Sequence, residues 1–191
     1  TAVAVHALQL AKVEEGDNVA VLGPGPIGLL ALQAAKAMGA DRVALTGTRE
    51  NRLELGEGLG ADITVNINDE DPVELLRREM GGGPGIVLDA AGTTSSFNQA
   101  INLTAKGGSI VLVSGWNQVN WSPGIIIGKE LTLRGSLASP GAWPMAIDLI
   151  ESGKVRVKPI ITHRFPLKDI PRAFSLVKRR EDGIVKAVIL P

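Results

Sequence analysis

The sequence contains no cysteine and no tyrosine, and only 3% of its 191 residues are aromatic. Without cysteine the chain forms no disulfide and offers no thiolate to a metal ion. The formal net charge is +0, so nothing points to nucleic acid or a membrane surface as a partner. The densest basic run, Lys178-Arg179-Arg180, is typical of a solvated helix end. No apolar run approaches the roughly 18 residues needed to cross a bilayer, and we expect a cytoplasmic protein.

The residues that are present predict strands and helices in strict alternation. Hydrophobic residues make up 45% of the chain, which is ordinary for a folded α/β protein. Apolar runs at six places predict strands, and helical spacing or capping residues predict the helices around them. The expected strands are Val19–Leu22, Arg42–Thr46, Ile63–Asn66, Ile86–Asp89, Ser109–Val113 and Leu131–Leu137. The expected helices are Thr1–Val13, Ile27–Met38, Arg52–Leu59, Pro72–Met80, Ser95–Leu103 and Trp143–Glu151, with Trp116–Lys129 irregular.

This alternation indicates a Rossmann-type, doubly wound sheet of six parallel strands within an α/β domain of residues 1–155. The pattern breaks over residues 156–191, where two extended runs, Ile160–Phe165 and Ile184–Leu190, flank a helical one at Leu167–Arg179. We interpret this tail as a segment that belongs to another domain. Because Thr1 opens directly into a helix, we also expect the chain to be a piece of a longer protein.

A glycine-rich turn, Gly23-Pro24-Gly25-Pro26-Ile27-Gly28, joins the first strand to the next helix. Its glycines have the G-x-G-x-x-G spacing of a dinucleotide-binding loop. Gly23 allows the sharp turn, Gly25 lets backbone approach a pyrophosphate, and Gly28 lets the helix pack closely on the strand. The prolines have no N–H, so the phosphate donors must come from their neighbours at the helix N-terminus. The alternative is a glycine-rich turn that binds nothing.

The end of the second strand favours NADP over NAD. An NAD site normally has an acidic residue here, about 20 residues past the glycines, to accept from the ribose 2′-hydroxyl. This sequence has Gly47 instead, followed by Thr48 and Arg49, with Arg52 close behind. Guanidinium groups match phosphate geometry, and Thr48 adds a hydroxyl. The alternative is an NAD site in which Glu50 holds the ribose and Arg49 stacks on adenine.

Several runs resemble the medium-chain dehydrogenase/reductase family, which includes zinc alcohol, sorbitol and threonine dehydrogenases. The matching runs are Gly16–Gly28, Ala34–Ala40, Arg52–Leu55, Leu59–Asp62, Asp89–Gly92, Gly107–Val113 and Thr162–Leu167. The resemblance covers nearly the whole chain and implies the cofactor-binding domain without the N-terminal domain that carries the catalytic zinc. With two histidines and no cysteine, this chain lacks the ligands of the family's zinc site. We assign it no metal ligand and no catalytic residue.

The remaining candidate site residues follow strand ends, where ligands of open α/β sheets bind. By resemblance Ala90-Ala91-Gly92 lies near the adenosine, and Val113-Ser114-Gly115 and Leu137 lie near the nicotinamide. Lys186 matches a basic position that the family uses near the pyrophosphate, although it also fits a surface lysine on an edge strand.

The resemblance implies hydride transfer between a nicotinamide and a small alcohol or carbonyl substrate, in a protein of which this chain holds the cofactor. Alone, the chain is expected to bind rather than to catalyse. A zinc-free quinone-reductase-like enzyme and a non-catalytic dinucleotide-binding module are the alternatives. The family also implies a homo-oligomer formed by edge-to-edge pairing of the strand Leu131–Leu137.

Overall fold

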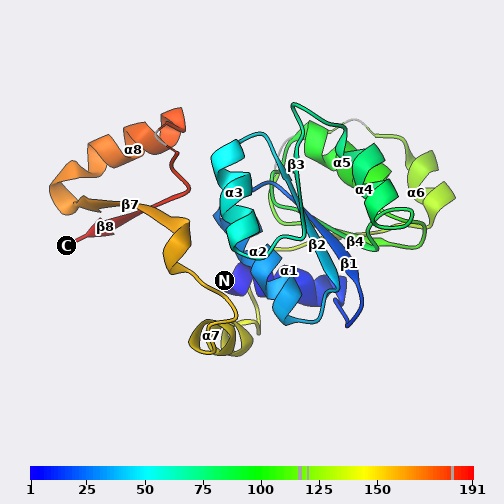
Figure 1. The fold of residues 1–191 in the computed structure, drawn as a ribbon, viewed down its shortest axis with the longest axis horizontal. Coiled ribbons are helices and arrows are strands. Elements are labelled where there is room, and N and C mark those ends of the chain that lie inside the picture. Colours follow the sequence, from blue (N-terminus) through cyan, green and yellow to red (C-terminus); the bar gives the residue numbers. More distant parts are fainter. Residues whose placement is uncertain (116–117, 120, 182) are drawn as a thin grey trace.

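Six parallel strands form the central sheet of the computed structural model, which describes residues 1–115, 118–119, 121–181 and 183–191. Their order is β3-β2-β1-β4-β5-β6, so the chain starts in the middle and winds outward in both directions (Figure 1). The expected doubly wound, six-stranded sheet is therefore confirmed. The strands are β1 (Asn18–Leu22), β2 (Arg42–Gly47), β3 (Ile63–Asn66), β4 (Ile86–Asp89), β5 (Ser109–Leu112) and β6 (Thr132–Gly135).

Helices cover both faces of this sheet because both faces of each central strand are apolar. One face packs against α1 (Ala2–Ala11), α2 (Pro26–Ala37), α3 (Glu50–Gly58) and α7 (Trp143–Glu151). The other packs against α4 (Pro72–Glu79), α5 (Thr94–Leu103) and α6 (Pro123–Lys129). In β1, Val19 and Val21 point to the first layer while Ala20 and Leu22 point to the second.

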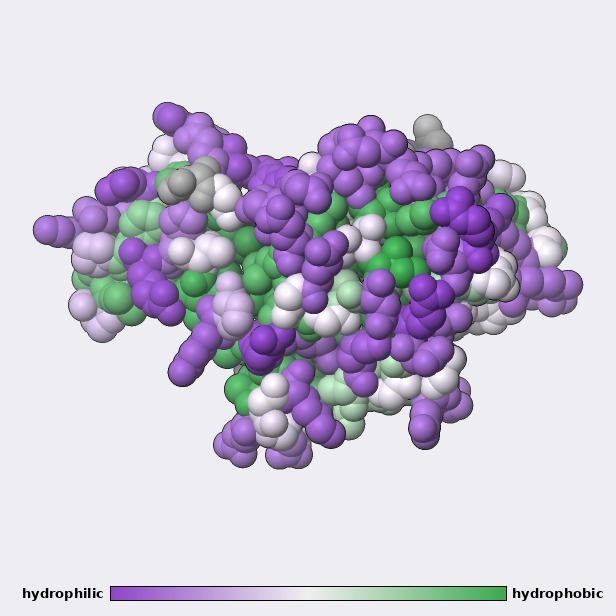
Figure 2. All heavy atoms as spheres, viewed as in Figure 1, coloured by the Kyte–Doolittle hydropathy of each residue, from purple (hydrophilic) through white to green (hydrophobic). Residues whose placement is uncertain are grey.

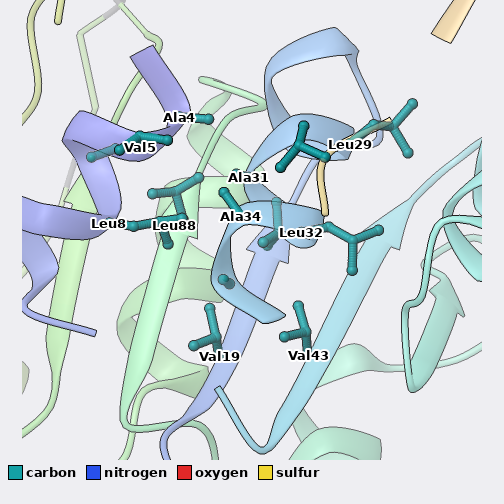
Figure 3. Close-up of a cluster of buried hydrophobic side chains, with 14 of the residues drawn as sticks. Ala4, Val5, Leu8, Val19, Leu29, Ala31, Leu32, Ala34, Val43 and Leu88 are labelled. Carbon is teal, nitrogen blue, oxygen red and sulfur yellow. The ribbon is translucent and has the colours of Figure 1, made fainter. Parts of the chain in front are cut away.

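The larger core lies between the sheet and helices α1 and α2 (Figure 3). Leu8 of α1, Leu32 of α2 and Leu88 of β4 have no exposed surface. Burying a leucine of this kind contributes about 1.5–3 kcal/mol relative to leaving it in water. The alanines of α2, such as Ala31 and Ala34, let that helix lie close to the strands beneath it. This packing fixes the N-terminus of α2 beside the end of β1, where the glycine-rich turn lies.

The C-terminal segment forms a separate two-stranded parallel sheet, β7 (Ile161–Pro166) and β8 (Lys186–Leu190), joined by α8 (Ile170–Arg179). Short 3-10 turns, η1 (Lys158–Ile160) and η2 (Leu167–Asp169), precede β7 and α8. This C-terminal unit lies beside α3 (Figure 1). The buried Gln33 side chain holds its start, since it accepts from the Arg156 amide at 2.7 Å and donates to the Arg156 carbonyl at 3.3 Å.

Two expectations differ from the structure. The region Trp116–Lys129 was expected to be irregular, but Pro123–Lys129 is the helix α6; Trp116, Asn117 and Asn120 lie outside the described residues. The sixth strand is shorter than Leu131–Leu137, because only Thr132–Gly135 pairs with β5. The other elements lie where they were expected, with ends that differ by at most three residues; the largest difference is at α8, because Leu167–Asp169 forms the 3-10 turn η2. No helix among the described residues is long and apolar enough to cross a membrane.

Candidate functional site

A cleft of about 560 Å³ opens at the carboxyl ends of β1, β2 and β4. Here the chain leaves each strand through a tight turn, and backbone hydrogen bonds tie the turns together. The Gly23 amide donates to the Thr46 carbonyl at 2.9 Å, and the Ala90 amide donates to the Leu22 carbonyl at 2.9 Å. The cleft is thus built on the central strands of the sheet. Its lining residues are Leu22, Gly23, Pro24, Gly25, Thr46, Gly47, Thr48, Arg49, Arg52, Ile67, Ala90, Ala91, Thr93, Ser95, Ser96, Gln99 and Arg180.

The glycines of the first turn differ in what surrounds them. Gly23 has a φ of +101°, and a Cβ there would lie 2.9 Å from Ala91. A Cβ on Gly28 would lie 2.0 Å from the Gly23 carbonyl oxygen, so this glycine allows helix α2 to contact the turn. By contrast, a Cβ on Gly25 would meet nothing within 4 Å. Gly25 therefore borders open space, at the N-cap of α2, where helical N–H groups are unpaired.

Gly47 is required by its neighbour across the cleft. A Cβ at this position would lie 2.4 Å from Cγ of Pro24, in the middle of the glycine-rich turn. The Pro24 ring therefore excludes any larger residue, including the aspartate or glutamate of an NAD site. The absence of a carboxylate at the end of β2 is thus built into the packing of the two turns.

Three arginines line the cleft at the end of β2. Arg49 is the N-cap residue of α3, Arg52 lies in its first turn, and Arg180 follows the last residue of α8. Burial lowers the pKa of Arg52, and the positive charges of Arg49 and Arg180 lower it further. No ion pair among the described residues involves any of the three. This corner of the cleft is therefore a concentration of positive charge suited to an anion.

Glu50 is the acidic residue nearest to Gly47 in the sequence, but its carboxylate is hydrogen-bonded to Asn66. Its Oε2 accepts from Nδ2 of Asn66, at the end of β3, at 3.2 Å. Asn68 donates to the Thr48 carbonyl at 3.2 Å and so closes the same turn. Glu50 is absent from the residues that line the cleft within the described chain. This arrangement disfavours the alternative in which Glu50 holds a ribose.

Asp89 shapes the opposite wall of the cleft. Its buried carboxylate accepts from the amides of Ala91 and Gly92, both at 3.0 Å, and from the Ser96 hydroxyl at 3.0 Å. Burial raises the pKa of Asp89, although these three hydrogen bonds act in the opposite direction. Thr93 and Ser96 form a reciprocal capping box at the start of α5. Asp89 therefore fixes the turn between β4 and α5 rather than facing a ligand.

The structure brings part of the predicted site together. The cleft is lined by Gly23, Gly25, Gly47, Thr48, Arg49, Arg52, Ala90 and Ala91. Pro26, Ile27 and Gly28 lie behind it in the first turn of α2. Gly92 contacts the turn after β5, because a Cβ on Gly92 would lie 2.5 Å from the Ser114 hydroxyl and 2.5 Å from the Gly115 amide. The exposed Leu137 follows β6, Val113 follows β5, and Lys186 opens β8, all outside the cleft lining.

Nine lining residues were not among the predicted site residues; three of them, Leu22, Pro24 and Thr46, are direct neighbours of predicted glycines. Ile67, Thr93, Ser95, Ser96 and Gln99 come from segments that follow β3 and β4, and the Thr93–Ser96 spacing was a usable N-cap signal. Arg180 belongs to the basic run interpreted as a solvated helix end. All three residues of the run are exposed, as that interpretation expects, but Arg180 also lines the cleft.

Comparison with known proteins decides the family. A family model described as a zinc-binding dehydrogenase matches residues 26–152. The chain belongs to the zinc-binding dehydrogenase family. Sorbitol dehydrogenase from Bos taurus is 36% identical over 181 residues, a match that covers 93% of this chain and 51% of that protein. This zinc-binding dehydrogenase chain thus spans about half the length of the relatives it matches, and the resemblance to medium-chain dehydrogenases is confirmed.

Solved structures of dehydrogenases have the same fold. 2R,3R-butanediol dehydrogenase from Bacillus subtilis superposes with a TM-score of 0.91 at 32% identity, covering 100% of this chain and 55% of that one. A protein described as a zinc-binding dehydrogenase from Sinorhizobium meliloti, bound to NADP, has a TM-score of 0.91 at 30% identity, covering 100% and 57%. An Escherichia coli alcohol dehydrogenase complexed with NADH superposes with a TM-score of 0.90 at 28% identity, covering 100% of this chain and 57% of that one. Both nicotinamide cofactors therefore occur among the structural neighbours.

The residues of this zinc-binding dehydrogenase chain do not fit a zinc ion. No group of three or more His, Cys, Asp or Glu side chains in the described part of the chain could hold a metal. Cysteine is absent and the two histidines, His6 and His163, lie on α1 and β7. The chemistry of a bound metal therefore enters no step that we assign to these residues.

Proposed function

We propose that this chain is the NADP-binding part of an alcohol or polyol dehydrogenase. The bound nicotinamide would exchange a hydride with the alcohol or carbonyl carbon of a small substrate. The residues of this chain bind and orient the cofactor. The glycine-rich turn and the N-terminus of α2 take the pyrophosphate, and the arginine corner takes the 2′-phosphate of the adenosine ribose. Val113, Ser114, Gly115 and Leu137 remain our candidates for the nicotinamide side, and Lys186 for the pyrophosphate.

The observation that carries the proposal is the chemistry at the end of β2. Arg49 and Arg52 line the cleft, Pro24 excludes a carboxylate from position 47, and Asn66 binds the carboxylate of Glu50 elsewhere. A 2′-phosphate would bring two negative charges to a corner that has only positive ones among its described lining residues. An unsubstituted ribose 2′-hydroxyl would find no carboxylate acceptor there.

The test is a calorimetric titration of the chain with NADPH and with NADH at fixed ionic strength. We expect NADPH to bind at least about tenfold more tightly, since each charge-assisted hydrogen bond to phosphate is worth about 1.5–3 kcal/mol. Equal or tighter binding of NADH would refute the preference. Failure to bind either cofactor would refute the proposed function itself.

We also propose that residues 156–191 belong to a second domain whose other part lies outside this chain. A two-stranded sheet is at best marginally stable without further packing, and the C-terminal unit offers its own sheet only the helix α8 and two short turns. Large apolar side chains of this unit are exposed, including Phe174 at 72% and Leu167 at 61%. Green apolar atoms reach the surface at the end of the molecule that holds β7, β8 and α8 (Figure 2). Such a surface is typical of a covered face.

Assembly through β6 is a further part of the proposal. β6 ends the sheet, and its outer edge pairs with no other described strand. An unpaired edge of this kind can join the same edge of a second copy across a two-fold axis. Its four residues, Thr132–Gly135, make the edge shorter than the sequence suggested. Light scattering of wild type and of Leu133→Pro, which lacks one backbone donor in β6, tests this assembly. We expect a dimer for wild type and a monomer for the variant.

A further inference from the structure

We infer that Arg180, supplied by the C-terminal unit, is a third residue that selects the 2′-phosphate of the cofactor. This inference rests on the proposed function. Arg180 differs from Arg49 and Arg52, which follow β2, because it comes from the segment that we place in a second domain. Cofactor choice would then depend on how the C-terminal unit is held against the sheet, as well as on the turn after β2.

Besides the Gln33 bonds to Arg156, two hydrogen bonds join that unit to the first turn of α3. Asn51 donates from Nδ2 to the Gly183 carbonyl at 3.2 Å, and Arg52 donates from Nη2 to the Ile184 carbonyl. Both donors belong to the first turn of α3, next to the arginine corner. A Cβ on Gly183 would lie 3.1 Å from Nδ2 of Asn51, so the Asn51 side chain packs closely against the Gly183 backbone. These contacts are made three and four residues after Arg180 and bring it to the cleft.

The backbone at Arg180 directs the chain toward the cleft. Arg180 is the C-cap of α8, with φ 56° and ψ 36°, and its amide donates to the Val177 carbonyl at 3.2 Å. This left-handed residue ends the helix and turns the chain toward α3. Its predecessor Arg179 is the last residue of the helix, is exposed, and does not line the cleft. Both arginines are exposed, but only Arg180 lines the cleft, which makes Arg179 a matched control.

Arg180 can add donors for a phosphate that Arg52 cannot supply, because the guanidinium of Arg52 is partly engaged. One of its nitrogens binds the Ile184 carbonyl, and its buried Nε has no hydrogen-bond partner among the described residues. Arg49, Arg52 and Arg180 line the same cleft, and none of them forms an ion pair with a described carboxylate. Three like charges repel one another, and this repulsion is relieved when a phosphate dianion binds between them.

The experiment compares two ligands that differ in the 2′-phosphate alone, adenosine 2′,5′-bisphosphate and adenosine 5′-monophosphate. Calorimetry of the full 191-residue chain measures both affinities for wild type, Arg180→Asn and the matched control Arg179→Gln. Asparagine keeps the left-handed cap because it adopts positive φ more readily than most residues. A second variant, Arg180→Lys, keeps the charge and removes the planar fork. Thermal unfolding of each variant checks that it is folded.

We expect Arg180→Asn to weaken the bisphosphate about tenfold and the monophosphate less than about twofold. Arg180→Lys should lose less, and Arg179→Gln should match wild type for both ligands. The inference is overturned if wild type prefers the bisphosphate but Arg180→Asn and Arg179→Gln behave alike. A wild-type chain with no preference for the bisphosphate refutes the proposed NADP function instead, and the inference with it.

Discussion

Alanine at Gly28 is expected to destabilise the fold, because the added methyl group has no room. Its Cβ would lie 2.0 Å from the Gly23 carbonyl oxygen and 3.3 Å from Cγ1 of Val21. The closer contact is with backbone, which no side-chain rotation can relieve. The turn and helix α2 must therefore separate by about 1.4 Å to bring this contact to the 3.4 Å at which ordinary van der Waals contact begins. Overpacking of a close-packed interior costs about 1–3 kcal/mol, and we expect about 3 kcal/mol here.

The same substitution at Gly25 is the matched control. A Cβ there meets nothing within 4 Å, and the φ of −82° suits alanine. Restricting the unfolded chain stabilises by about 0.4–1 kcal/mol, while alanine is a poorer N-cap than glycine by a similar amount. We therefore expect a net change within about 0.5 kcal/mol. Cofactor affinity should still fall about tenfold or more, because the methyl group occupies the space where backbone approaches the pyrophosphate.

Urea unfolding followed by circular dichroism measures the first effect, and NADPH titration of the folded chain measures the second. The reasoning predicts a crossed result, in which Gly28→Ala loses stability and Gly25→Ala loses binding. A Gly25→Ala chain that binds NADPH like wild type would show that the pyrophosphate does not pass over this turn. A Gly28→Ala chain of unchanged stability would show that α2 does not depend on this contact.

Three further predictions test other parts of the site. Thr48→Glu adds a carboxylate to an exposed lining position and should weaken NADPH about tenfold without weakening NADH, whereas Thr48→Gln should not; an unchanged ratio would contradict this. Burial raises the pKa of Asp89, so the stability that its protonated form provides is complete below about pH 3.9 and is lost as the pH rises through the folded-state pKa. The free energy of unfolding of Asp89→Asn, measured in urea, should therefore rise relative to that of wild type between pH 4 and pH 7. A difference between the two proteins that stays constant over this range would refute the prediction. Lys129 donates to the Ile101, Asn102 and Thr104 carbonyls at 3.0, 2.6 and 2.8 Å, so Lys129→Met should cost about 1 kcal/mol, while the exposed Lys106→Met should stay within about 0.5 kcal/mol.

The sheet and its order of elements could be predicted because local signals agree along the chain. Apolar runs mark the strands, Asp71 and Pro72 mark the start of α4, and Gly39 and Gly60 follow the ends of α2 and α3. Helix α6 was missed although Ser122 and Pro123 have the residue types of an N-cap and a first helical position. Gly124 and Gly128 weaken its helical pattern, and its partly buried Ile125 and Ile126 gain stability only by packing on the second core.

Long-range contacts account for the rest of the site. The Pro24 ring against Gly47 and the Asn66 amide against Glu50 explain why no carboxylate enters the cleft, but neither contact has a local signal. Arg180 is the clearest case, since it is as exposed as its neighbours in sequence and only the docking of the C-terminal unit on α3 brings it to the cleft. All the candidate cofactor-binding residues stay predictions, both those that line the cleft and those after β5, β6 and in β8.

The bonds between α3 and the C-terminal unit also set the order in which the cleft is completed during synthesis. They join residues 132 positions apart, so closing them is among the slowest steps open to the chain. The strands and the glycine-rich turn emerge from the ribosome long before Arg180 does. Under the proposed function, a nascent chain would fold its pyrophosphate site before it has its full arginine corner, and discrimination between the two cofactors would be the last property that the cleft acquires.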